Sequence, residues 1–169
     1  MASRRLQNRE TELKEQKMQD TVQINDRFTI AKFAPETDQI REAAQEGFQS
    51  LINMQTDDED KKLKMRPQEE GQKAKQAGLT FLHHPVDGEK LSEDLVDDFR
   101  QKATDLPAPI LVHCASGKRS GAFVMMHIGC EEGMTGEEVV KKAEEMGFEC
   151  DTPELEDFVK NYVDSHNGK

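Results

Sequence analysis

Short apolar stretches alternate with longer amphipathic ones along most of the chain, and this pattern predicts strands and helices in turn. The apolar stretches are rich in aliphatic, β-branched and aromatic residues and have the length of single strands. We expect four of them in one sheet, over Phe28–Phe33, Phe48–Met54, Leu79–His84 and Ile110–Val112. The last stretch is wholly apolar, which favours a strand that is covered on both faces of the sheet.

The segments between these stretches carry signals for the beginning and end of helices. Thr37, Ser92 and Thr135 can cap a helix N-terminus, and Pro67 suits a first helical turn. We expect helices over about 37–47, 67–78, 92–105, 120–130, 135–147 and 152–165. Strands that alternate with helices, followed by helices alone, predict an α/β fold. The expected architecture is a three-layer sandwich with a central, mainly parallel sheet of four to five strands flanked by helices.

The N-terminal region does not follow this alternation. Residues 1–25 are polar, and their few apolar positions are spaced too irregularly for a coiled coil. We expect a polar tail or a frayed helix there, with a partner-binding helix as the alternative. Residues 26–169 are then one domain, because a chain of this size is typical of a single domain with its own core.

The most informative stretch follows the central apolar strand and covers residues 113–120. Cys114 stands where the strand ends, a loop containing Gly117 follows, and an apolar helix begins at Ser120. The N–H groups of such a loop and of a helix N-terminus carry partial positive charge and can converge on one anion. Arg119 adds a planar guanidinium that can bind two oxygens of a tetrahedral anion. The residues expected to bind the substrate here are His113, Ala115, Ser116, Gly117 and Lys118.

Cys114 is the expected nucleophile. A thiol near a helix N-terminus and cations can have its pKa lowered from about 8.5 to roughly 3.5–7.5, which makes it largely a thiolate at neutral pH. Ser120 can donate a hydrogen bond to the sulfur, and His113 can orient the loop by hydrogen bonding. A buried, unreactive cysteine is the alternative, but it would leave the grouping of Gly117, Arg119 and Ser120 without a reason.

The order His-Cys-x-x-Gly-x-Arg-Ser in residues 113–120 resembles the signature of cysteine-dependent phosphatases of the tyrosine and dual-specificity kind. Most of that superfamily has five residues between the cysteine and the arginine. The four found here resemble a bacterial subfamily, the beta-lactamase-hydrolase-like phosphatase domain. Further stretches are similar to the same subfamily, and they are Gly47–Asn53, Glu70–Leu79 and His84–Asp87. The resemblance covers about residues 26–130 and implies a dual-specificity-phosphatase-like sandwich.

The resemblance also implies a phosphoric monoester hydrolase, which acts on phosphotyrosine, a phosphoprotein or a small aryl phosphate through a phosphocysteine intermediate. Cys114 would attack phosphorus while Arg119 and the loop amides hold the equatorial oxygens. In the family, an aspartate in a loop before the cysteine protonates the leaving group. Asp87 fits this role, because it directly follows a strand whose end shares the sheet edge with Cys114. A turn aspartate that caps its own backbone is the alternative, with Glu89 and Asp94 as the other candidate acids.

Two other functions remain open. Rhodanese-type sulfurtransferases also have four residues between the cysteine and the arginine of their active loop, and there Cys114 would carry a persulfide. The tight loop favours this chemistry, whereas Asp87, Ser120 and the flanking resemblance favour phosphate. The third alternative is a phosphate-binding module without catalytic activity.

Composition limits the expected partners. A net charge of −11 disfavours nucleic acid and anionic membranes. The resemblance implies a phosphorylated small molecule or a phosphoprotein as the partner. Three cysteines without a C-x-x-C pair do not resemble a disulfide framework. No apolar run has the length of a membrane span or the position of a signal-peptide core, so we expect a cytoplasmic protein. His127 and Cys130 have a helical spacing, but two ligands do not make a metal site, and we expect no metal or other cofactor.

Overall fold

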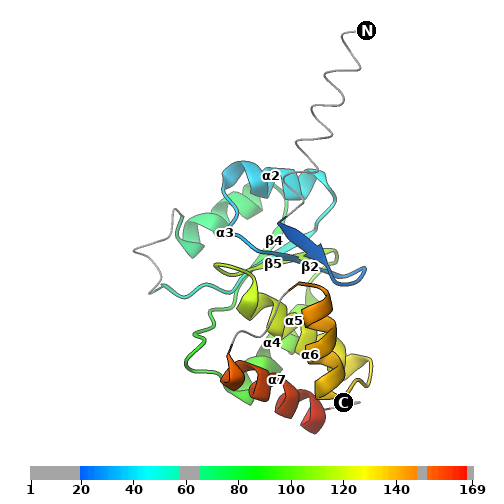
Figure 1. Cartoon of the computed structure of the whole chain (residues 1–169). Helices are drawn as coiled ribbons and strands as arrows, with labels where there is room; N and C mark the ends of the chain where they lie inside the picture. The colour runs from blue at the N-terminus through cyan, green and yellow to red at the C-terminus, as the bar shows by residue number, and fades with distance from the viewer. Residues whose placement is uncertain (1–19, 58–64, 148–151, 167–169) are drawn as a thin grey trace.

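The computed structural model describes residues 20–57, 65–147 and 152–166, and helices cover both faces of its sheet (Figure 1). The sheet has five strands, which are β1 (Thr21–Gln23), β2 (Phe28–Ala31), β3 (Ser50–Asn53), β4 (Thr80–His83) and β5 (Ile110–His113). The helices of the described residues are α2 (Thr37–Gln45), α3 (Pro67–Gln76), α4 (Glu93–Asp105), α5 (Lys118–Glu131), α6 (Gly136–Glu145) and α7 (Pro153–His166). The predicted α/β sandwich is confirmed.

The strand order β1-β2-β5-β3-β4 puts β5 in the middle of the sheet. Strands β2, β5, β3 and β4 are parallel, and only β1 runs antiparallel to its neighbour β2. In this register His113, the last residue of β5, lies between Ala31 of β2 and Asn53 of β3. The segment that follows β5 therefore leaves the sheet at the centre of its carboxyl edge.

Two helical layers enclose the sheet, and successive residues of β5 face them alternately. Figure 1 shows α2 and α3 on one side of the sheet and α4, α5, α6 and α7 on the other. Leu111 packs with Ile40 of α2 and Ala74 of α3, whereas Ile110 and Val112 belong to the larger core under the other four helices. All of β5 is buried, as the wholly apolar run Ile110–Val112 predicts.

Strand β1 differs from the expectation for the N-terminal region. Thr21–Gln23 pairs with β2 in a segment that we assigned to a polar tail. A strand of three residues at the edge of a sheet is only partly buried, so it shows no apolar pattern. The sheet therefore already includes Thr21, which precedes the domain boundary that we expected at residue 25. Residues 1–19 of the predicted tail lie outside the described residues.

Helix caps agree with the predicted signals at two of the helices. Ser92 Oγ accepts the N–H of Leu95 at 3.2 Å, and Thr135 Oγ1 accepts the N–H of Glu138 at 3.2 Å. At α2 the cap is Glu36, one residue before the predicted Thr37. Helix α5 begins at Lys118 and not at Ser120, which brings its N-terminus closer to the loop that follows β5.

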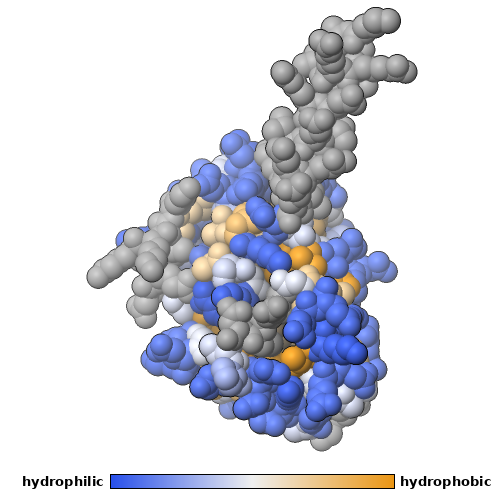
Figure 2. All heavy atoms as spheres, viewed as in Figure 1, coloured by the Kyte–Doolittle hydropathy of each residue, from blue (hydrophilic) through white to orange (hydrophobic). Residues whose placement is uncertain are grey.

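Hydrophilic residues dominate the surface. Figure 2 shows them over most of the visible face, with smaller apolar areas between them. This distribution agrees with a chain in which 34% of the residues are charged. In the part of the chain that the structure describes, no helix combines the length and apolar character that crossing a bilayer requires.

Candidate active site

The loop between β5 and α5 holds the predicted nucleophile at the carboxyl edge of the sheet. Strand β5 ends at His113, residues 114–117 form the loop, and α5 begins at Lys118. Helix α5 is largely buried behind the loop, so its N-terminal N–H groups are held in place by the core. The strand, loop and helix that the sequence predicts around Cys114 are therefore present, and they can act as an anion cradle.

Gly117 gives the loop its shape. Its φ of +90° lies in the left-handed region, which a residue with a side chain rarely adopts. A Cβ atom at this position would also lie 3.1 Å from Cγ and 3.2 Å from Cα of Lys32, which follows β2. The loop is thus packed closely against the neighbouring chain, and the sequence needs glycine here for two independent reasons.

Hydrogen bonds converge on the sulfur of Cys114, which is only 1% exposed. The N–H of Gly117 donates to Sγ at 3.2 Å, and Ser120 Oγ lies 3.5 Å from Sγ. Burial alone would raise the pKa of the Cys114 thiol. The hydrogen bonds from the side chain and backbone of Ser120, followed by the charge of Arg119, outweigh burial and lower that pKa below its ordinary value. The site therefore favours the thiolate.

The two basic residues that follow the loop, in the first turn of α5, have different environments. Arg119 is partly buried, and its Nη1 donates to the carbonyl oxygen of Val86 at 2.8 Å. Lys118 is exposed on the first turn of α5, as are Ala115 and Ser116 within the loop. Arg119 therefore joins the loop to the segment after β4, whereas Lys118 is at the surface.

Asp87 follows Val86 directly, so the contact of Arg119 places the aspartate in a segment adjoining the loop. Asp87 is exposed, and its Oδ1 accepts the N–H of Glu89 at 2.9 Å. This is the turn geometry that we considered as the alternative role for Asp87. The two roles are compatible, because a carboxylate has two oxygens and only Oδ1 makes this bond.

His113 is fully buried and makes contacts on both sides of its ring. Its Nδ1 lies 3.2 Å from the carbonyl oxygen of Cys114, and its Nε2 lies 2.7 Å from Oε2 of Glu70 on α3. This geometry fits the predicted orienting role. It does not fit the predicted contact between His113 and a substrate, because protein groups occupy both ring nitrogens.

Glu70 was not among the predicted site residues, although the sequence contains a signal for it. The buried positions of α3 are Pro67, Glu70, Gly71 and Ala74. Their spacing of three to four residues defines one helix face, and Glu70 is a charged residue on that face. A charged residue on a buried face needs a partner, and here the partner is His113.

The remaining histidines lie in other environments. His83 Nε2 is 2.7 Å from the carbonyl oxygen of Gln55, and His84 is buried with its ring 5.6 Å from that of Phe99. His127 Nδ1 accepts from Arg100 at 3.3 Å. No group of three or more His, Cys, Asp or Glu side chains within the described ranges is arranged to hold a metal ion. Cys150 lies outside those ranges.

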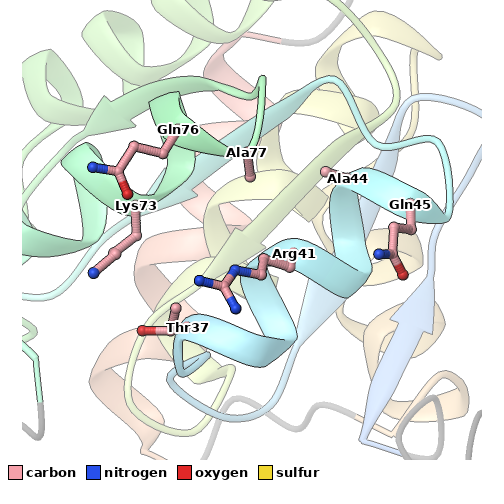
Figure 3. Close-up of a pocket in the computed structure, with 7 residues that line it drawn as sticks. All are labelled: Thr37, Arg41, Ala44, Gln45, Lys73, Gln76 and Ala77. Carbon is pink, nitrogen blue, oxygen red and sulfur yellow. The ribbon is translucent and has the colours of Figure 1, made fainter.

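A groove of about 450 Å³ lies between α2 and α3, away from the loop residues. Figure 3 shows Arg41 reaching from α2 toward α3, which contributes Lys73 and Gln76. None of the predicted site residues lines this groove. The candidate active site is therefore the loop after β5, where the buried thiol is.

Comparison with known proteins matches residues 20–129 to the family model described as beta-lactamase hydrolase-like protein, phosphatase-like domain. A beta-lactamase hydrolase-like protein from Xylella fastidiosa strain Temecula1 is 29% identical over 128 residues. The match covers 76% of this chain and 29% of the relative. The chain thus spans less than a third of the length of that curated relative.

Solved structures share the fold at low sequence identity. A candidate phosphatase from Neisseria meningitidis Z2491 superposes with a TM-score of 0.70 and 22% identity, covering 83% of this chain and 96% of that one. The core catalytic domain of the PP-IP phosphatase SIW14 from S. cerevisiae has a TM-score of 0.65 and 14% identity, covering 83% of each chain. These likenesses extend through most of the sandwich and establish its architecture.

Proposed function

The chain belongs to the family of beta-lactamase hydrolase-like phosphatase domains, and on this basis we propose that it is a cysteine-dependent phosphatase that hydrolyses phosphomonoesters. One observation carries the proposal: the buried Cys114 sulfur accepts a hydrogen bond from Gly117 at the N-terminus of a helix, beside Ser120 and Arg119. The substrates that we propose are phosphotyrosine, a phosphoprotein or a small aryl phosphate. The names of the structural neighbours agree with a phosphatase.

The proposed reaction has two steps. In the first, the Cys114 thiolate attacks phosphorus, an S–P bond forms, and the bond between phosphorus and the leaving oxygen breaks. Asp87 gives its proton to that oxygen. In the second, water attacks the phosphocysteine, Asp87 takes a proton from the water, and the S–P bond breaks to release inorganic phosphate. Arg119 and the loop N–H groups stabilise the charge on the equatorial oxygens in both steps.

Arg119 can bind the substrate without giving up its contact with the segment after β4. Its Nη1 donates to the carbonyl oxygen of Val86. A guanidinium has five N–H donors, so Arg119 can keep this contact while other N–H groups bind phosphate oxygens. The contact would then link the oxyanion to the segment that carries Asp87.

A sulfurtransferase is the second candidate function, and the short distance along the chain between Cys114 and Arg119 favours it. With four intervening residues, the loop has one N–H fewer than the common phosphatase loop. A persulfide on Cys114 would need the cationic loop but no proton donor. Asp87 would then have only its role in the turn.

Two assays of the purified protein distinguish these functions, one with a phosphate ester and one with thiosulfate. We expect release of p-nitrophenolate and inorganic phosphate from p-nitrophenyl phosphate, and complete loss of this activity in Cys114→Ser. Thiosulfate and cyanide should give no thiocyanate. Thiocyanate without phosphate release would assign the sulfurtransferase. Binding of phosphate with neither reaction would assign the non-catalytic module. Cys130→Ser serves as the control, because that cysteine is on α5 outside the loop.

A further inference from the structure

We propose that Glu70 is a positioning residue for the loop after β5 and that it acts through His113. In this view Glu70 holds the imidazole so that Nδ1 donates to the carbonyl of Cys114, and this fixes the first peptide of the loop. The inference rests on the proposed function only in taking this loop as the binding site for an oxyanion.

The contacts form a continuous chain from α3 to the loop. Glu70 and His113 are 43 residues apart in the sequence, and their side chains are 2% and 0% exposed. Glu70 Oε2 lies 2.7 Å from Nε2, and Nδ1 lies 3.2 Å from the Cys114 carbonyl oxygen. Water does not compete at this depth, so the contacts are stronger than at a surface.

The protons on His113 follow from the partners of its ring. A carbonyl oxygen can only accept, so Nδ1 must carry a hydrogen to make its bond. The second proton lies between Nε2 and the Glu70 carboxylate, on one side or the other. In either arrangement, Glu70 satisfies Nε2 while Nδ1 remains a donor. Without Glu70 the buried Nε2 would lack a hydrogen-bond partner. A turn of the ring or a change of its tautomer would then lower the free energy of the site.

The orientation of the carbonyl matters because a peptide bond is planar. In a trans peptide the C=O group and the following N–H group point in opposite directions. Holding the Cys114 carbonyl on the imidazole therefore directs the N–H of Ala115 away from His113. Ala115 is exposed in the loop, so its N–H becomes available to an oxyanion beside Cys114.

A side chain of β4 packs closely against α3 beside Glu70. A Cβ atom on Gly71, the next residue, would be only 2.8 Å from Cδ1 of Phe81 on β4. Glycine at this position lets α3 approach closely enough for Glu70 to reach His113. The neighbouring Glu69 is also in the first turn of α3 but is exposed. A favourable interaction with the helix dipole is therefore available to Glu69 as well and does not explain the burial of Glu70.

Two conservative variants test the proposal. Glu70→Gln keeps the length of the side chain and can donate from its amide to Nε2, but it removes the charge. Glu70→Asp keeps the charge and shortens the side chain by one methylene group. We expect Glu70→Asp to weaken binding of inorganic phosphate by about tenfold and Glu70→Gln to weaken it by less. Phosphate affinity is measured as protection of Cys114 from iodoacetamide, followed by mass spectrometry.

Glu69→Gln is the matched control and should bind phosphate as the wild type does. Unchanged phosphate affinity in both Glu70 variants, with folding verified by circular dichroism, would overturn the proposal. A normal phosphate affinity in Glu70→Asp together with a large loss of affinity in Glu70→Gln would also overturn it. Phosphate binding would then depend on the charge of Glu70 and not on the orientation of His113. The measurement needs no turnover, so a wild type that binds phosphate without hydrolysing an ester would refute the proposed function and leave this test valid.

Discussion

Two clusters of hydrogen-bonded polar side chains join the helices of this sandwich, and they shift the pKa of Cys114 and that of Tyr162 in opposite directions. The loop cluster connects α3, β5 and α5 and consists of Glu70, His113, Cys114 and Ser120. The helix cluster connects α4, α5 and α7 and consists of Asp97, Arg100, His127 and Tyr162. Both contain hydrogen-bonded side chains from distant parts of the chain. Of the two, only the loop cluster adjoins the main-chain N–H groups of the loop at the carboxyl edge of the sheet.

The helix cluster is centred on Arg100 and Tyr162. Arg100 donates to His127 Nδ1 and to Tyr162 Oη, both at 3.3 Å, and Tyr162 Oη donates to Asp97 Oδ1 at 2.5 Å. Burial, with the hydrogen bond to Asp97, raises the pKa of Tyr162 to about 12 against the opposing effect of Arg100. The cluster therefore favours the neutral form of the Tyr162 hydroxyl.

The loop cluster favours the charged form of its thiol, because hydrogen bonds and Arg119 outweigh the effect of burial on the pKa of Cys114. A perturbed pKa is thus found in both clusters, and by itself it does not identify a functional site. The distinguishing features are the direction of the shift and the loop N–H groups beside the shifted group. The following predictions test this distinction.

Loss of the Arg119 guanidinium should have the largest of the expected effects, and it concerns anion binding. We expect Arg119→Ala to weaken the binding of vanadate or phosphate by about 100-fold, because charge-assisted hydrogen bonds to an oxyanion are lost. Lys118→Ala should have a small effect, since Lys118 is exposed. Arg100→Ala removes a guanidinium from the helix cluster and should not change anion binding. Competitive inhibition measures all three, and equal losses in Arg119→Ala and Lys118→Ala would contradict the assigned roles.

At mildly acidic pH, iodoacetamide should alkylate Cys114 more than about tenfold faster than Cys130. The lowered pKa of Cys114 keeps a thiolate present as the pH falls, whereas burial raises the pKa of Cys130 and confines its thiolate to alkaline pH. Iodoacetamide should therefore label Cys114 first, and phosphate should protect it. Equal labelling of the two residues across the pH range, measured by mass spectrometry, would show that the loop does not stabilise the thiolate.

The proton donor should produce a smaller effect that depends on the substrate. Asp87→Asn should slow hydrolysis of an alkyl phosphate about tenfold more than that of p-nitrophenyl phosphate, because only the poor leaving group needs a proton in the transition state. Asp97→Asn in the helix cluster should show no such dependence. If Asp87→Asn shows none either, the acid is Glu89 or Asp94, and Asp87 serves only the turn in which it accepts the Glu89 N–H.

The sequence predicts those parts of the site that are contiguous in the chain. Cys114, Gly117, Arg119 and Ser120 lie within one strand–loop–helix segment, so their order already implies their proximity. Strand β5 is also predictable, because burial on both faces of the sheet leaves the continuous apolar run Ile110–Val112. Strand β1 is missed because it is short and its stability comes from pairing with β2.

Contacts between distant segments could not be derived from local patterns. The contact of Arg119 with Val86 spans 33 residues, and that of His113 with Glu70 spans 43. Each depends on how closely a helix or loop approaches the sheet, which is determined by packing at positions such as Gly71. The helix cluster was missed for the same reason, since its members come from three separate helices.

The smallest expected effect concerns stability, and it belongs to the helix cluster. Tyr162→Phe keeps the ring that stacks on His166 at 4.0 Å but removes the hydroxyl between Arg100 and Asp97. We expect the free energy of unfolding at pH 7 to fall by about 1–2 kcal/mol, the cost of losing partly buried hydrogen bonds to charged partners. Hydrolysis of p-nitrophenyl phosphate at saturating substrate should be unchanged, because the members of the cluster lie on α4, α5 and α7 and none of them belongs to the loop after β5.

The pH dependence gives this last prediction a definite sign. The tyrosine of the unfolded chain loses its proton near pH 10, whereas that of the folded chain keeps it to about pH 12. The stabilising contribution of the neutral hydroxyl is therefore complete below about pH 10 and is lost as the pH rises toward 12. Urea unfolding of wild type and Tyr162→Phe should show their difference narrowing over this interval. A difference that widens there, or a large loss of turnover in Tyr162→Phe, would show that the helix cluster also acts on the site.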